Sequence, residues 1–358
     1  MKIAVAMSGG VDSSVTAALL KKEGHIVTGI TMLVVPEDEA RGTRASETAS
    51  QVAEVLGIKH HVIDLRAIFA DQIISKFCEQ YSLGRTPNPC VQCNKYIKFG
   101  VLYEKARELG TEMLATGHYA QIEKRAADGR FLLLKGIDRR RDQSYFLYGL
   151  TQEQLSHTLF PLGNRTKNSV KEIAAGMNLP VASSESREIC FIPDNNYSRF
   201  LRKYSSSSTK PGVIKDLRGN ALGEHRGIIN YTIGQRKRLG IAAKQPLYVV
   251  AIDSESNTVV VGEKKDIYSQ ECIITDVNWT ATSGISGVMQ VHAKIRYLHP
   301  EAEAVLTPED RGKVRIKFSQ PQMAITSGQS AVFYDGDVVL GGGIIEEVVC
   351  GYKNPLAN

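Results

Sequence analysis

A glycine and serine loop near the start of the chain constrains its fold more than any other feature. The run Ser8-Gly9-Gly10-Val11-Asp12-Ser13-Ser14 separates an extended run (residues 3–7) from an apolar-periodic stretch that starts at Val15. Two glycines let the chain turn sharply and let backbone amides approach an anion, and serine hydroxyls add donors at a helix N-terminus whose dipole favours phosphate. The lysine and spacing of the Walker motif are absent. The loop therefore predicts a pyrophosphate-binding turn of another type.

The same residues can also cap a helix without binding a ligand, because Ser and Asp are common caps. The pattern that follows favours a nucleotide. Extended runs at residues 25–33, 61–65 and 112–116 alternate with helical patterns at residues 45–56, 68–81 and 97–109. Alternation of this kind predicts βαβ units and a parallel sheet, whose crevice at the strand ends binds nucleotides. The SGGxDS pattern resembles the PP-loop of ATP pyrophosphatases, which cleave ATP between the α and β phosphates.

The texture of the sequence changes twice, which predicts three domains. Residues 1–204 form the α/β, Rossmann-like nucleotide-binding domain. A serine run and Pro211-Gly212 then introduce residues 205–268, with short strands expected at 212–214, 227–231, 247–252 and 258–262. Residues 269–358 alternate clearly at 291–297, 302–306, 314–318 and 330–334, with Asp335-Gly336 as a hairpin signal. A small, mostly β domain and a C-terminal antiparallel β-barrel are expected.

Six cysteines in 358 residues, without a secretory segment at the start, do not predict a disulfide scaffold. A soluble, cytoplasmic protein without a membrane span is expected.

The motif Cys90-Val91-Gln92-Cys93 follows a proline-set turn and leads into a helical segment, which favours the thiolate form. A lone C-x-x-C fits a zinc site, a redox pair or sulfur handling, and the further ligands that zinc needs are absent. Cys190, between apolar neighbours, reads by itself as a core thiol, and Cys78, Cys272 and Cys350 as packing residues.

Several motifs together resemble one family. SGGVDSS, TPNPCVQCNKYIKFG, ATGHYA, DQSYFLYGL, ICFIP and GQRKRLGI occur in the order and rough spacing of tRNA-uridine 2-sulfurtransferases, the MnmA/TrmU family, over nearly the whole chain. Members adenylate the 2-oxygen of the wobble uridine with ATP and then displace AMP with sulfur. The resemblance implies ATP with Mg²⁺, and an ATP site made of Ala6, Met7, Ser8, Gly9, Gly10, Val11, Asp12, Ser13, Met32 and Gly117.

The resemblance also implies a role for two of the cysteines. It implies that Cys93 is the nucleophile and that Cys190 carries persulfide sulfur, the two being able to pair as a disulfide after transfer. The best-known family pattern has Asp where this chain has Cys90. Cys90, Cys93 and Cys190 can therefore also be read as a three-thiolate set for a four-iron, four-sulfur cluster with one open iron. The sequence leaves the persulfide and cluster routes open, and it predicts no other metal site.

The partner implied by the resemblance is tRNA for lysine, glutamate and glutamine, with a cysteine desulfurase or sulfur-relay protein as sulfur donor. Basic residues outnumber acidic ones by 44 to 38, and Arg139-Arg140-Arg141 and residues 235–238 form basic runs that suit phosphates or solvent. The family's tRNA contacts correspond here to Asn88, Pro89, Cys90, His118, Arg141, Asp142, Gln143, Arg296, Tyr297 and Gln329.

Two other functions share part of these features. Amidotransferase synthetases and tRNA lysidine synthetase also carry a PP-loop, but they attack the adenylated oxygen with nitrogen and do not need Cys93 and Cys190. An RNA-binding protein with a degenerate nucleotide domain would carry a damaged glycine loop, and the loop here is intact.

Overall fold

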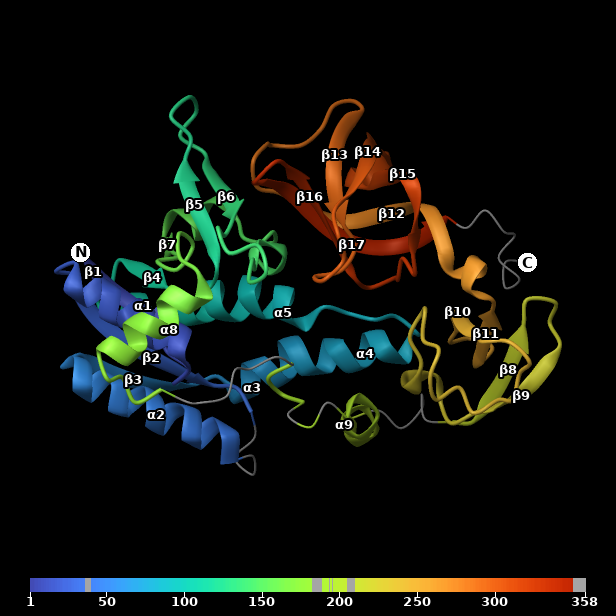
Figure 1. The fold of residues 1–358 in the computed structure, drawn as a ribbon, viewed down its shortest axis with the longest axis horizontal. Helices are drawn as coiled ribbons and strands as arrows, with labels where there is room; N and C mark the ends of the chain where they lie inside the picture. Colours follow the sequence, from blue (N-terminus) through green and yellow to red (C-terminus); the bar gives the residue numbers. More distant parts are fainter. Residues whose placement is uncertain (36–39, 182–188, 193, 195, 205–209, 350–358) are drawn as a thin grey trace.

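The computed structural model describes residues 1–35, 40–181, 189–192, 194, 196–204 and 210–349, and Figure 1 shows their arrangement. Cys350 lies outside the described residues. No helix in the described part of the chain combines the length and the apolar character that a membrane crossing requires.

A five-stranded parallel sheet forms the centre of the first part. Its strand order is β3-β2-β1-β4-β7, with β1 Lys2–Ala6, β2 Ile26–Leu33, β3 Lys59–Asp64, β4 Met113–Ala115 and β7 Thr158–Leu159. β1 runs through the middle and is buried on both faces, as its apolar residues Ile3, Ala4 and Val5 require. The order reverses between β1 and β4, and ligands of open α/β sheets bind at such a reversal. The predicted α/β class is confirmed.

Helices cover both faces of this sheet (Figure 1). On one face, α1 (Val11–Lys22), α2 (Ala40–Leu56) and α8 (Lys167–Gly176) enclose an apolar core that includes Val15, Val52 and Val170. On the other face lie two helical segments, separated by a non-helical stretch at residues 83–88. The first runs from α3 (Arg66–Phe69) through the π-helix η1 (Ala70–Ser75) to α4 (Lys76–Ser82). The second runs from α5 (Pro89–Gln92) through the π-helix η2 (Cys93–Val101) to α6 (Leu102–Glu108). The helix α9 spans Tyr197–Tyr204.

A β-hairpin joins the first part to the last. β5 (Ala120–Lys124) pairs with β6 (Phe131–Lys135), and β6 continues into the C-terminal sheet, where Leu134 lies opposite Val338 of β17. Arg130 at the hairpin donates hydrogen bonds to the carbonyls of Thr280 and Trp279 at 2.7 and 2.9 Å. Figure 1 shows the hairpin standing beside the barrel. The hairpin that follows β4 of the parallel sheet is therefore joined to the barrel by backbone pairing.

The middle part is a small four-stranded sheet of order β10-β11-β8-β9, with β8 Gly212–Asp216, β9 Ala221–His225, β10 Tyr248–Asp253 and β11 Thr258–Gly262. The strand expected at residues 227–231 is wrong: a 3-10 turn, Ile228–Asn230, occupies this place. Gly227 has a φ of 100°, which ends any extended run because only glycine adopts it readily.

The C-terminal part is the predicted antiparallel barrel. Its strands are β12 Tyr268–Trp279, β13 Met289–Lys294, β14 Ala302–Pro308, β15 Val314–Met323, β16 Ser330–Asp335 and β17 Val338–Val349. The order β12-β15-β14-β13-β16-β17 closes because β12 also pairs with β17. The β16–β17 hairpin lies where it was predicted: Asp335 ends β16, and Gly336, at a φ of +55°, begins the turn before Val338. Gly341, Gly342 and Gly343 lie inside β17, where neighbouring backbone leaves no room for a Cβ.

Candidate functional site

The loop between β1 and α1 leaves the first turn of α1 open to a ligand. The N-cap of α1 is Gly10, which provides no side-chain cap, so Asp12 and Ser13 are not the caps that the alternative reading required. Ser13 instead accepts a hydrogen bond from the Ser8 amide and donates one to the Gly10 carbonyl, both at 3.1 Å. The loop is held by its own hydroxyls, and the helix dipole at its end favours an anion.

Gly9 and Gly117 let this loop pack tightly. Gly9 has a φ of +72°, and a Cβ there would lie 2.8 Å from the Ala45 carbonyl oxygen. Gly117 follows β4, and its Cβ would lie 2.9 Å from the Asp12 Cβ and 3.0 Å from the Ser13 amide nitrogen. The ends of β1 and β4 therefore meet at the loop, as the proposed ATP site needs.

The other residues assigned to ATP surround the same strand ends. Ala6 ends β1, and the Met7 amide that follows donates to the Ile30 carbonyl at 2.8 Å. Met32, near the end of β2, is half-buried against the apolar core that also contains Cys93.

A buried lysine that the sequence did not reveal binds Asp12. The Lys167 ammonium donates to both carboxylate oxygens of Asp12, at 2.8 and 2.7 Å, and the Tyr119 hydroxyl donates to one of them at 2.8 Å. The Lys167 side chain is 8% exposed and that of Asp12 33%. Lys167 is the first residue of α8, which Thr166 caps, so α8 presents this cation to the loop. No local pattern signals a partner 155 residues away.

The thiols lie where α5 passes into η2. Asn88 is the N-cap of α5 and Pro89 its first residue, so the proline-set turn predicted there is present. Cys90 is half-buried, Cys93 is buried and Cys190 is exposed. Burial raises the pKa of Cys90 to about 11 and that of Cys93 to about 12. The expectation that the helix N-terminus favours thiolate is therefore wrong, because burial raises the pKa of both thiols more than the Lys98 charge lowers it.

The three thiols interact with one another. Cys190 raises the pKa of both Cys90 and Cys93, and Cys90 also raises that of Cys93. Within the described part of the chain, however, no group of three His, Cys, Asp or Glu side chains is arranged to hold a metal ion.

His118 connects the nucleotide loop to the thiols. It follows Gly117, its Nδ1 lies 2.7 Å from the Thr116 hydroxyl, and its ring packs 6.0 Å from that of Phe99 in η2. Burial lowers the pKa of His118 well below its ordinary value, and Lys98 lowers it further. The imidazole is neutral at physiological pH, so a contact with tRNA there would be a hydrogen bond and not an ion pair.

The segment assigned to tRNA is built partly into the protein. Asp142 is buried, and its carboxylate accepts hydrogen bonds from the amides of Gly136 and Ser144 and from the Ser144 hydroxyl. The Gln143 side-chain oxygen accepts the Tyr119 amide at 3.0 Å. Arg141 is half-buried. Asp142 and Gln143 therefore fix the shape of this segment, whatever they contribute to tRNA.

The barrel residues expected to contact tRNA lie close to the catalytic domain. The ring of Tyr297 lies 4.4 Å from that of Phe146, and Arg296 donates to the Met323 carbonyl at 2.7 Å. The Gln329 amide donates to the Thr86 carbonyl at 2.9 Å, just before the loop that contains Asn88 and Pro89. The structure thus brings the catalytic domain and barrel together at one seam.

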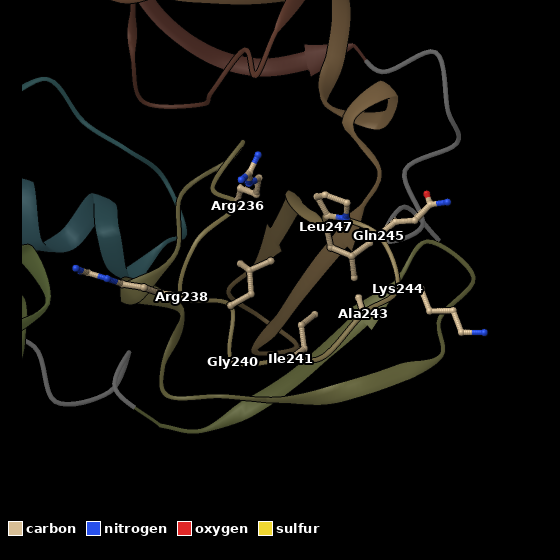
Figure 2. Close-up of a pocket in the computed structure, with 10 residues that line it drawn as sticks. Arg236, Arg238, Gly240, Ile241, Ala243, Lys244, Gln245 and Leu247 are labelled. Atoms are coloured by element: carbon tan, nitrogen blue, oxygen red, sulfur yellow. The ribbon is translucent and has the colours of Figure 1, made fainter.

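The basic run at 235–238 belongs to the middle domain and directly follows Gly234, where a Cβ would lie 2.7 Å from the Ala324 Cβ of the barrel. Figure 2 shows Arg236 and Arg238 pointing in different directions at a cleft of about 510 Å³. The cleft is lined by Arg236, Arg238, Leu239, Gly240, Ile241, Ala243, Lys244, Gln245, Pro246 and Leu247.

Three family models match the chain in sequence: a tRNA methyl transferase HUP domain over residues 1–194, a tRNA methyl transferase PRC-barrel domain over 198–263, and an aminomethyltransferase β-barrel domain over 269–345. Among solved structures, the U34-tRNA thiolase NcsA of Methanococcus maripaludis, with its iron–sulfur cluster, aligns at a TM-score of 0.37 and 19% identity, over 57% of this chain and 63% of that one.

Curated relatives match over nearly their full length. The chain is 52% identical to tRNA-specific 2-thiouridylase MnmA 1 of Caldanaerobacter subterraneus subsp. tengcongensis, over 97% of this chain and 98% of the relative. It is 47% identical to tRNA-specific 2-thiouridylase MnmA of Acetivibrio thermocellus, over 96% and 99%. These relatives give no support to an amide-forming enzyme.

Proposed function

The chain belongs to the tRNA-specific 2-thiouridylase family, a family of sulfurtransferases, and from this premise we propose that it replaces the 2-oxygen of the wobble uridine of tRNA with sulfur. The proposed reaction consumes ATP, held as its Mg²⁺ complex by the loop at residues 8–13 and by Gly117. Transfer of AMP to the 2-oxygen turns that oxygen into a leaving group.

The observation that carries this proposal is the position of His118. It follows the glycine that contacts Asp12 and Ser13, and it packs on the helix that carries Cys93. Through Gly117 and His118, the nucleotide loop therefore adjoins the helix that carries the buried thiol, which supports a shared site. An enzyme that activates an oxygen and then attacks with sulfur needs both groups within reach of one base.

In the proposed second half-reaction, the terminal sulfur of a Cys190 persulfide attacks C2 of the adenylated uridine and AMP leaves with the former 2-oxygen. The Cys93 thiolate then attacks Sγ of Cys190, the bond between Sγ and the transferred sulfur breaks, and its electron pair remains on that sulfur as the thiocarbonyl forms. A Cys93–Cys190 disulfide results, which a thiol reductant returns to two thiols. The exposure of Cys190 suits loading by a cysteine desulfurase or relay protein.

The test uses purified protein, wobble-uridine tRNA, Mg²⁺ and ATP, and a cysteine desulfurase with cysteine. Mass spectrometry of digested nucleosides should show 2-thiouridine with the wild type and none with Cys190→Ala. Cys272→Ala serves as the matched control, because Cys272 is buried in the barrel core. Failure of the wild type to form 2-thiouridine, or full activity of Cys190→Ala, contradicts the proposal.

The same preparation separates the persulfide route from the cluster route. Protein purified without oxygen should be colourless, free of stoichiometric iron and active with a persulfide donor. A brown protein that loses colour and activity together in Cys90→Ala would instead assign Cys90, Cys93 and Cys190 to a cluster.

The proposed substrates are the tRNAs for lysine, glutamate and glutamine, and the proposed location is the cytoplasm. The residues proposed to contact the tRNA are Asn88, Pro89, Cys90, His118, Arg141, Asp142, Gln143, Arg296, Tyr297 and Gln329. Phosphate contacts make the affinity fall with salt.

A further inference from the structure

Lys98 lies in η2, and the reaction proposed above assigns it no role. It is half-buried, and among the residues that the structure describes its ammonium has neither an ion-pair partner nor a hydrogen-bond partner. A partly desolvated cation without a counter-ion is costly to maintain, and such groups concentrate at functional sites.

The π-helix aims Lys98 at the thiols. Cys93 and Lys98 are the first and sixth residues of η2, and a π-helix bonds residues five apart. Five residues of an ordinary α-helix would turn the two side chains about 140° away from each other. The π-helical backbone therefore places a cation and the buried thiol on the same side of one helix.

Three groups on separate segments respond to the Lys98 charge. It lowers the pKa of Cys93 in η2 and of Cys90 in α5, against the larger raising effect of burial, and it lowers the pKa of His118 after β4. The other charges that act on these thiols are the thiols themselves, including Cys190. Among the described residues, Lys98 is thus the only cation that shifts the pKa of Cys90 and Cys93.

We propose that Lys98 is the cation of the sulfur-transfer centre, which stabilises the Cys93 thiolate and the persulfide anion on Cys190. This inference rests on the proposed thiolation. Burial keeps Cys93 protonated before transfer, so an anionic sulfur formed during the reaction needs a nearby positive charge. When Cys93 releases its proton to water and attacks Sγ of Cys190, Lys98 offsets the developing negative charge.

The proposal is tested first on the thiol, without tRNA. Below the thiol pKa, the rate of alkylation by iodoacetamide follows the thiolate fraction. Lys98→Met keeps the aliphatic stem and removes the charge. A rise of about one unit in the Cys93 pKa lowers the thiolate fraction about tenfold, partly offset by the higher nucleophilicity of a more basic thiolate. The net expectation is alkylation of Cys93 about three- to fourfold slower, by peptide mass spectrometry between about pH 7 and 9.

Two further variants make the result specific. Lys98→Arg keeps the charge and should alkylate at the wild-type rate. Lys95→Met removes a lysine of the same helix that lies 5.3 Å from the Tyr96 ring centroid and does not act on the Cys93 thiol, so it should also match the wild type. Lys98→Gln provides a second neutral side chain if Lys98→Met does not fold, and it should slow alkylation to the same extent.

A single-turnover reaction with tRNA completes the test. Lys98→Met should slow formation of 2-thiouridine more than release of pyrophosphate, because the charge acts on sulfur and not on ATP. Unchanged alkylation of Cys93 in both folded neutral variants would overturn the role of Lys98 even if the wild type thiolates tRNA. A wild type that forms no 2-thiouridine would instead overturn the proposed function, whatever the alkylation rates.

Discussion

The ion pair between Lys167 and Asp12 gives the sharpest prediction about the nucleotide loop. Lys167→Met keeps the buried stem of the side chain and leaves the Asp12 carboxylate with the Tyr119 hydroxyl as its remaining side-chain donor. Removing one partner of a buried ion pair costs about 3–5 kcal/mol. Asp12 is 33% exposed, so water replaces part of the lost interaction. We therefore expect a loss of about 2–3 kcal/mol, equivalent to a fall in Tm of about 5–10 °C.

Differential scanning calorimetry measures this change, since it separates transitions of different domains. Lys22→Met, which removes an exposed lysine at the end of α1, is the matched control and should shift Tm by less than about 2 °C. Asp12→Asn combined with Lys167→Met should be more stable than the sum of the single effects predicts, with a coupling of at least about 1 kcal/mol. A Lys167→Met protein that melts with the wild type, or strict additivity in the double variant, refutes the pair as a determinant of loop stability.

Three other changes test other parts of the site. Gly117→Ala should raise the KM for ATP about tenfold or more, because its Cβ would lie 2.9 Å from Asp12; Gly176→Ala, with open space at its Cβ, should leave this KM unchanged. His118 has a folded pKa below its ordinary 6.5, so the unfolded chain binds more protons and stability falls as the pH drops below 6.5. The stability gap between wild type and His118→Gln, measured by thermal unfolding, should therefore shrink from pH 7.5 to 5.5 by up to about 1.4 kcal/mol; a constant gap contradicts a neutral His118. Cys272→Ala should lower stability by about 1 kcal/mol and keep the thiolation rate, whereas a lost rate would assign chemistry to this core thiol.

Local patterns predicted the parts of the fold that local physics determines. The glycine loop, the alternation of strands and helices and the Asp335-Gly336 hairpin are each encoded within a few residues, and each is present. The strand expected at 227–231 is absent because the positive φ of Gly227 turns the chain, even though the β-branched Ile228 and Ile229 follow it. The domain boundaries at 204 and 268 remain predictions.

The structural features that the sequence did not predict depend on residues far apart in the chain. The hairpin at residues 120–135 joins the barrel through Leu134 and Val338, and no local pattern specifies an edge pairing across that separation. Lys167 meets Asp12 only after α8 docks on α1. Lys98 lies on the same side of the helix as Cys93 because η2 is a π-helix, and α-helical periodicity would have placed it on another side. Burial of the thiols, which reverses the expected shift of their pKa, likewise follows from tertiary packing.

The central claim is that one crevice activates the uridine oxygen with ATP and then replaces it with sulfur. An anticodon stem-loop RNA synthesised with ¹⁸O at the 2-position of the wobble uridine tests this most directly. Incubation with the protein, ATP and a persulfide donor should yield 2-thiouridine together with AMP whose phosphate carries the ¹⁸O. Unlabelled AMP, or ADP as the nucleotide product, alongside 2-thiouridine would contradict adenylation of the oxygen.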